Sequence, residues 1–105
     1  MKITLGIGKS TNCYLGCIAM DSVREITFEG EKLGECRNVR YDPYYGSTLG
    51  ISQALYRVNG KLLVHTEEWS SYRDRQEYYG GINVVSESDL LPGGDFEALG
   101  RACGL

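Results

Sequence analysis

The dipeptide Asn59-Gly60 constrains the fold more than any other feature of this chain. It stands in the stretch "ALYRVNGKLLVHTEEW", between two runs rich in β-branched and aromatic residues. A two-residue hairpin turn needs positive φ at both central positions, and Asn followed by Gly adopts that conformation readily. The stretch therefore predicts a β-hairpin over residues 52–70 and a sheet that contains it.

Other segments extend this sheet. Residues 2–7 alternate apolar and polar positions, which is typical of a half-buried strand. Residues 23–41 also alternate and predict a second hairpin that turns at Glu29-Gly30-Glu31. Residues 41–50 collect proline, glycine and serine around three tyrosines and predict a loop. A last strand is expected over residues 82–85, after either an edge strand or a bend around Gly80-Gly81.

Helical patterns are few. "FEALGRACG" at residues 96–104 predicts a helix: Asp95 before it can act as the N-cap, Phe96, Leu99 and Cys103 share one face, and Gly104 closes the helix. Residues 11–20 allow either a short helix or another strand. The expected fold is α+β: a single domain over residues 1–105, with an antiparallel sheet of about five strands built from hairpins, one C-terminal helix and possibly one short helix near residues 11–20.

Two stretches carry a resemblance to a known family. "ITFEGEKLGE" at residues 26–35, followed by "ALYRVNGKLLVHTEEWSSY" at residues 54–72, resembles the paired-hairpin body of the small bacterial proteins named EXLDI. The match covers less than half of the chain, and the terminal motif for which that family is named is absent. The biochemical role of the family is undefined, so the resemblance implies a fold and no activity.

Composition limits the classes of partner. The chain of 105 residues has 14 Asp and Glu against 11 Lys and Arg, a net charge of -3, so general attraction to nucleic acid or anionic lipid is not expected. Residues 1–64 hold 8 basic and 6 acidic residues, whereas residues 65–105 hold 3 and 8. The second half is therefore the acidic one. No membrane span or export signal is visible, which predicts a soluble protein in the cytoplasm.

In that compartment the four cysteines are expected to be reduced thiols. Buried packing is one interpretation, and a zinc site formed by Cys13, Cys17, Cys36 and Cys103 is the other. Zinc ligands usually come as two closely spaced pairs. Only Cys13 and Cys17 satisfy that spacing, so the sequence predicts neither a metal nor a cofactor.

Catalytic motifs are weak. Gly8-Lys9-Ser10-Thr11 ends like a phosphate-binding loop, but Ile3 stands where the loop's first glycine is needed. His65 is the single histidine. It could pair with Cys36, but the sequence around these residues has no motif of a cysteine enzyme. Catalysis is therefore the minority hypothesis.

Tyrosine is the most informative residue type. The chain has 8 tyrosines and 2 phenylalanines, and six of the tyrosines fall in two short windows. Tyr and Trp gather where one end of the ring is apolar and the other is wet, and they dominate protein interfaces together with Arg. Tyrosines that cover the edges of the sheet and pair across strands would give the same clustering without any partner protein. The candidate partner-binding residues are Trp69, Tyr72 and Arg73 as anchors, Tyr78 and Tyr79 as flanking contacts, Glu67, Glu68, Asp74 and Glu77 as charge mimics, and Tyr44 and Tyr45 as a second patch.

The leading hypothesis is a non-catalytic inhibitor that binds another protein. In size, acidity and lack of catalytic motifs the chain is similar to the anti-CRISPR group of phage inhibitors. That similarity implies a partner that is a bacterial defence effector, blocked at its nucleic-acid-binding surface by an acidic, tyrosine-rich face. Two alternatives stay open: a small enzyme or ligand-binding domain using His65 and a cysteine, and a structural component of a phage particle or a toxin-antitoxin pair.

Overall fold

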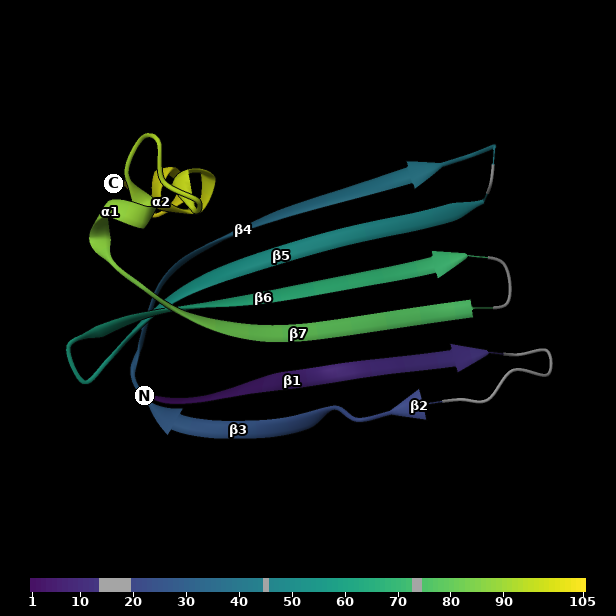
Figure 1. Cartoon of the computed structure of the whole chain (residues 1–105), viewed down its shortest axis with the longest axis horizontal. Helices are drawn as coiled ribbons and strands as arrows, with labels where there is room; N and C mark the ends of the chain where they lie inside the picture. Colours follow the sequence, from purple (N-terminus) through teal and green to yellow (C-terminus); the bar gives the residue numbers. More distant parts are fainter. Residues whose placement is uncertain (14–19, 45, 73–74) are drawn as a thin grey trace.

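The chain forms a strongly twisted antiparallel sheet with two short helices at one end (Figure 1). The computed structural model describes residues 1–13, 20–44, 46–72 and 75–105. None of the described helices has the length or apolar composition needed to cross a bilayer. The elements are β1 (Lys2–Cys13), β2 (Met20–Asp21), β3 (Arg24–Glu29), β4 (Glu31–Asp42), β5 (Ser47–Val58), β6 (Lys61–Tyr72), β7 (Arg75–Val85), α1 (Glu87–Leu90) and α2 (Glu97–Ala102).

The strands follow the order β2-β1-β7-β6-β5-β4, and β3 pairs with β1 beside this path. The predicted hairpin over residues 52–70 is confirmed as β5 and β6, with Asn59 at φ 50° and Gly60 at φ 76°. The α+β class holds in outline, because strands predominate and the C-terminal helix is present. The expected number of about five strands was too low.

The predicted hairpin over residues 23–41 was wrong in its pairing. Both strands exist, but β3 pairs with β1 and β4 pairs with β5. Gly30 makes the corner between them, and its N–H donates to the Met1 carbonyl at 3.0 Å. A Cβ atom there would lie 2.9 Å from the Arg57 carbonyl oxygen, so the chain passes too close to β5 for any larger residue. β3, which pairs with β1, and β4, which pairs with β5, are therefore consecutive strands that do not form a hairpin with each other.

Three other expectations need correction. The loop predicted over residues 41–50 is a short turn, because β4 runs to Asp42 and β5 starts at Ser47. Of the two alternatives before residue 82, the strand is present and the bend is not, because Gly80-Gly81 lie within the continuous strand β7; this strand pairs with β1 and β6 and is therefore not an edge. The short helix near residues 11–20 is contradicted at both ends by β1 and β2, and residues 14–19 lie outside the described residues.

The C-terminal helix begins one residue later than predicted. Its N-cap is Phe96 rather than Asp95, and no side chain caps it. Helix α1 was not predicted. The backbone N–H of Ser86 donates to Asp89 Oδ2 at 2.9 Å, which satisfies one polar group at the start of this single turn.

One face of the sheet carries the helices. Leu55 of β5 and Val64 of β6 form a fully buried cluster with Leu90 of α1 and Leu99 of α2. Among the described residues, these four are the largest fully buried side chains. We call this side of the sheet the helix face.

The opposite face is covered by the start of β1 and by β3. Because neighbouring residues of a strand point to opposite sides, Ala54 and Tyr56 face away from the helices. They pack against Ile3 and Leu5 of β1 in a second cluster. We call this side the β3 face.

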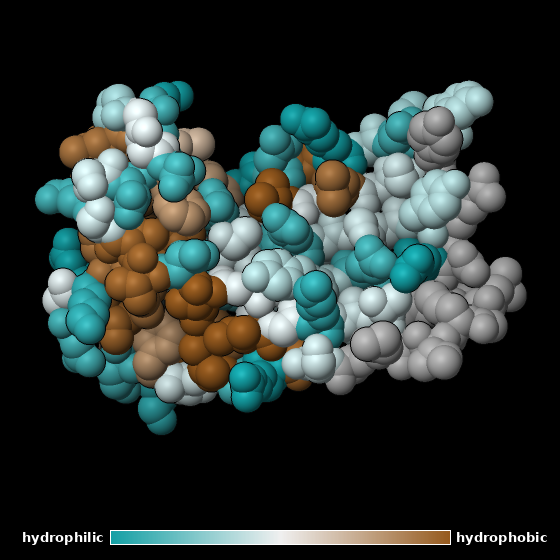
Figure 2. Space-filling view, in the orientation of Figure 1, coloured by the Kyte–Doolittle hydropathy of each residue, from teal (hydrophilic) through white to brown (hydrophobic). Residues whose placement is uncertain are grey.

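Both clusters lie in the same half of the sheet, so within the described residues the other half is a single layer. Figure 2 shows apolar side chains gathered over the end with the helices and the start of β1, whereas the tips of β4 to β7 are mostly polar. This open half comprises residues 8–13, 37–51 and 66–80. Its exposed apolar side chains include Val39, Tyr41, Leu49, Ile51, Tyr72 and Tyr79.

Candidate binding surface

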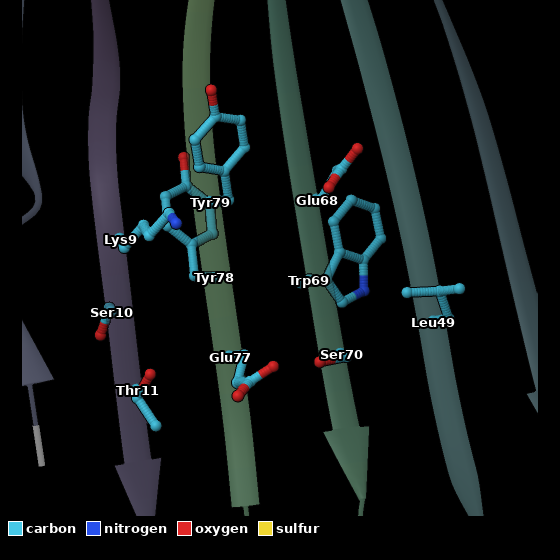
Figure 3. A pocket seen from close by; sticks show the side chains of 10 residues that line it. All are labelled: Lys9, Ser10, Thr11, Leu49, Glu68, Trp69, Ser70, Glu77, Tyr78 and Tyr79. Carbon is cyan, nitrogen blue, oxygen red and sulfur yellow. The ribbon is translucent and has the colours of Figure 1, made fainter.

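The helix face of the open half is hollowed around Ser70, a small residue of β6. Its cross-strand neighbours are Glu77 of β7 and Leu49 of β5. Two residues earlier on β6, Glu68 stands opposite Tyr79 of β7. Because larger side chains surround the serine, the surface forms a groove of about 630 Å³ (Figure 3). We call it the Ser70 groove.

Apolar groups flank this groove. Tyr79 is 42% exposed and Leu49 is 57% exposed, and they stand on different strands. A tyrosine ring offers a large apolar surface and a hydroxyl that can donate or accept a hydrogen bond. Since neither side chain is buried in the free protein, both are available to a partner.

The charges of the Ser70 groove are mixed. Lys9 Nζ lies 6.0 Å from the centroid of the Tyr79 ring. Arg75 Nε lies 3.1 Å from Glu77 Oε1, so that carboxylate already has a cation. Among the described side chains, Glu68 takes part in no ion pair. The groove can therefore accept hydrogen bonds from a partner, but it is not a purely anionic site.

Two further hollows continue from this groove toward β4. One, of about 240 Å³, contains Arg40, Ile51 and Glu68. The other, of about 420 Å³, reaches the turn between β4 and β5 at Pro43. Leu49 lines all three hollows. The helix face thus offers one connected surface across the open half, with Leu49 at its centre.

On the β3 face, Trp69 has a different environment. Its indole lies over Gly50 of β5, where a Cβ atom would collide with the ring. The guanidinium carbon of Arg37 lies 4.9 Å from the ring centroid, a cation–π contact. Trp69 is therefore half-buried between two strands of its own chain and contributes to packing as well as to the surface.

A polar network lies beside it, where β1 crosses the sheet. His65 is 4% exposed, and its Nε2 donates to the Gly6 carbonyl at 2.8 Å. Its Nδ1 lies 3.8 Å from Glu67 Oε1, and Tyr78 donates its hydroxyl proton to Glu67 Oε2 at 2.8 Å. Burial, followed by the hydrogen bond and the negative charge of Glu67, raises the pKa of Tyr78 well above its usual value. The network joins β1 to β6 and β7.

The structure separates His65 from the two described thiols. Cys36 and Cys103 belong to the cluster on the helix face, and His65 belongs to the β3 face. Burial raises the pKa of both thiols, which disfavours the reactive thiolate. Within the described residues no three His, Cys, Asp or Glu side chains come together as a metal site. The side chains of Cys13 and Cys17 lie outside that part of the chain.

The predicted binding residues are divided between the two faces. By strand alternation Glu68, Tyr72, Glu77 and Tyr79 point to the helix face and Glu67, Trp69 and Tyr78 to the β3 face. Trp69 and Tyr78 also line the Ser70 groove (Figure 3). Tyr44 is 85% exposed in the turn between β4 and β5, at the same end of the sheet. Tyr45, Arg73 and Asp74 lie outside the described residues.

The acidic charge is divided as well. Four carboxylates of the second half surround the helices at the covered end: Glu87, Asp89, Asp95 and Glu97. In the open half the described carboxylates are interspersed with Lys9, Arg37, Arg40 and Arg75. The predicted binding face is therefore rich in tyrosine but nearly balanced in charge.

Leu49, Lys9 and Ser70 were missed by sequence reasoning. Leu49 lay within a segment predicted as a loop, and its role follows only once β5 is extended to Ser47. Lys9 reaches the groove because β1 continues beyond Ile7 and pairs with β7.

Comparisons with family models, curated proteins and solved structures found no match for this chain.

Proposed function

We propose that this chain is a non-catalytic protein-binding module that docks a partner protein on the helix face of its open half. The observation that carries the proposal is the Ser70 groove, with Tyr79 and Leu49 exposed on either side of it. A single-layer sheet gives these residues a fixed spacing, so a partner meets a surface that is already formed.

The partner that we propose is a bacterial defence effector, which the chain would inhibit in the cytoplasm as anti-CRISPR proteins do. The balanced charge of the open half favours docking through aromatic and apolar contacts. It does not favour simple imitation of a nucleic acid, which would need a surface dominated by carboxylates. Tyr79 and Leu49 act as the anchors, and Glu68 and Glu77 accept hydrogen bonds at the edge of the contact.

The test is capture from a bacterial lysate by tagged protein, followed by affinity measurement with the purified effector. Tyr79→Ala and Leu49→Ala should each weaken binding by about 2 kcal/mol, or roughly 30-fold, because removal of a central anchor has that effect. Val84→Ala is the matched control, since Val84 is 70% exposed on the β3 face and away from the groove.

Salt dependence distinguishes the two modes of docking. Contact through Tyr79 and Leu49 should change little between low and high salt, whereas imitation of nucleic acid should weaken steeply. Unchanged affinity in both alanine variants would contradict the proposal.

A further inference from the structure

Strand β4 forms the outer edge of the sheet. Its ladder partner is β5, and among the described residues no strand pairs with its other side. β4 is 12 residues long. A long unpaired edge can accept a strand from another chain, and proteins usually protect such edges with bulges, prolines or charged side chains.

The outward-pointing backbone groups of β4 can be identified from the hairpin. A two-residue turn closes with a hydrogen-bonded pair, and such pairs then alternate along the ladder. When this alternation is followed from β6 across β5 to β4, the backbone N–H and C=O groups of Asn38 and Arg40 point toward β5. Those of Arg37, Val39 and Tyr41 point to the outer edge.

The end of β4 that contains these residues is weakly protected. Val39 is 48% exposed and Tyr41 is 66% exposed, both on the β3 face. The guanidinium of Arg37 lies on Trp69 instead of extending past the edge. The bulge in β4 lies at Lys32–Gly34, near helix α2 and outside this segment.

We propose that two copies of the chain pair antiparallel through their β4 edges, with Val39 on the two-fold axis. In such a pair the axis is normal to the sheet, so residues that face each other lie on the same face. An axis at Arg37 or at Arg40 would place identical positive charges opposite each other. An axis at Cys36 would bring the partner strand alongside Gly34, where the C-cap of helix α2 lies on β4: a Cβ atom at Gly34 would lie 2.5 Å from Cys103 Sγ.

An axis at Asn38 is possible but unites fewer apolar groups, because it places Arg37 opposite Val39. The axis at Val39 places Val39 opposite its copy and Arg37 opposite Tyr41. The exposed valines and tyrosines of both copies then form one apolar strip on the β3 face. The guanidinium of Arg37 stays on Trp69 of its own chain, so the aliphatic stem of Arg37 packs against the partner's tyrosine.

The pairing has a consequence for the helix face. A two-fold axis normal to the sheet keeps both copies the same side up, so both Ser70 grooves face the same direction. The dimer would offer two equivalent grooves on one continuous sheet, which increases avidity for a partner with repeated sites. The pairing itself does not depend on whether those grooves bind anything.

Sedimentation equilibrium of the purified chain tests the proposal. The native chain should have twice its monomer mass of 11.7 kDa. Val39→Lys and Val39→Glu should each halve that mass, because each places like charges on the axis. Val84→Lys is the matched control: Val84 is an exposed valine of another strand and should leave the dimer intact. Circular dichroism verifies that all variants are folded.

An equimolar mixture of the Val39→Lys and Val39→Glu chains should recover the dimer mass, because lysine then faces glutamate. That recovery is specific to an axis at Val39. A native chain that sediments as a monomer, a mixture that stays monomeric, or equal dissociation of Val84→Lys would overturn the proposal.

Discussion

Tyr78 illustrates how one side chain can link stability to pH. Its hydroxyl donates to Glu67 at 2.8 Å, and burial together with that carboxylate raises the pKa of Tyr78. The folded chain therefore keeps this proton at pH values at which the unfolded chain has begun to lose it. Since the unfolded state then binds fewer protons, the free energy of unfolding falls as pH rises above about 10.

Replacement of Tyr78 by Phe should reduce this alkaline loss of stability. At neutral pH the variant should be about 1 kcal/mol less stable, because it lacks the hydrogen bond to Glu67. Above about pH 10 the difference should shrink. Urea unfolding over a pH series measures both effects. Part of the alkaline decline should persist, because burial also raises the pKa of Tyr56.

Tyr79→Phe is the control for the loss of one phenol, since Tyr79 lies on the other face and its ring is exposed. If native chain and Tyr78→Phe keep the same difference in stability at every pH, the assigned proton linkage is wrong.

At the scale of elements, helix α2 depends on Leu99. This side chain is fully buried between the helix and the sheet, in the cluster with Leu55 and Val64. Leu99→Ala should lower the free energy of unfolding by about 2–5 kcal/mol, through lost burial and the cavity that remains. Leu91→Ala is the matched control, because Leu91 is 41% exposed and should cost much less. Similar losses in the two urea unfolding curves would contradict this assignment.

Local patterns predicted the elements better than their partners. The hairpin at Asn59-Gly60 is fixed by two neighbouring residues, so the sequence contains the information. The partner of β3 is not fixed by neighbouring residues, because the alternation of Arg24–Glu29 suits pairing with β1 as well as with β4. In the structure β3 pairs with β1, and Gly30 passes close to β5. The candidate site was predicted in part for the same reason. Tyrosines can be found in a sequence, whereas the face that each one occupies depends on register.

At the scale of the whole molecule, the two halves of the sheet differ in what supports them. Both apolar clusters lie in the covered half, so opening of that half exposes buried side chains to water. In the open half the strands are held mainly by their ladder hydrogen bonds. Local opening is easier where few apolar contacts are lost. Long strands such as β5 and β6 should therefore be stable at one end and labile at the other.

Native-state hydrogen exchange followed by NMR tests this difference within single strands. The amide of Leu55 should exchange more slowly than that of Leu49, although both point from β5 to β4. Likewise Val64 should be better protected than Ser70, and both point from β6 to β7. Val64 and Ser70 both lie in a regular ladder, so their difference isolates the effect of the covering layers, whereas Leu55 stands opposite Gly34 beside the bulge of β4. Uniform protection along β5 and β6 would show that the sheet opens as one cooperative unit, and the open half would then be as rigid as the core.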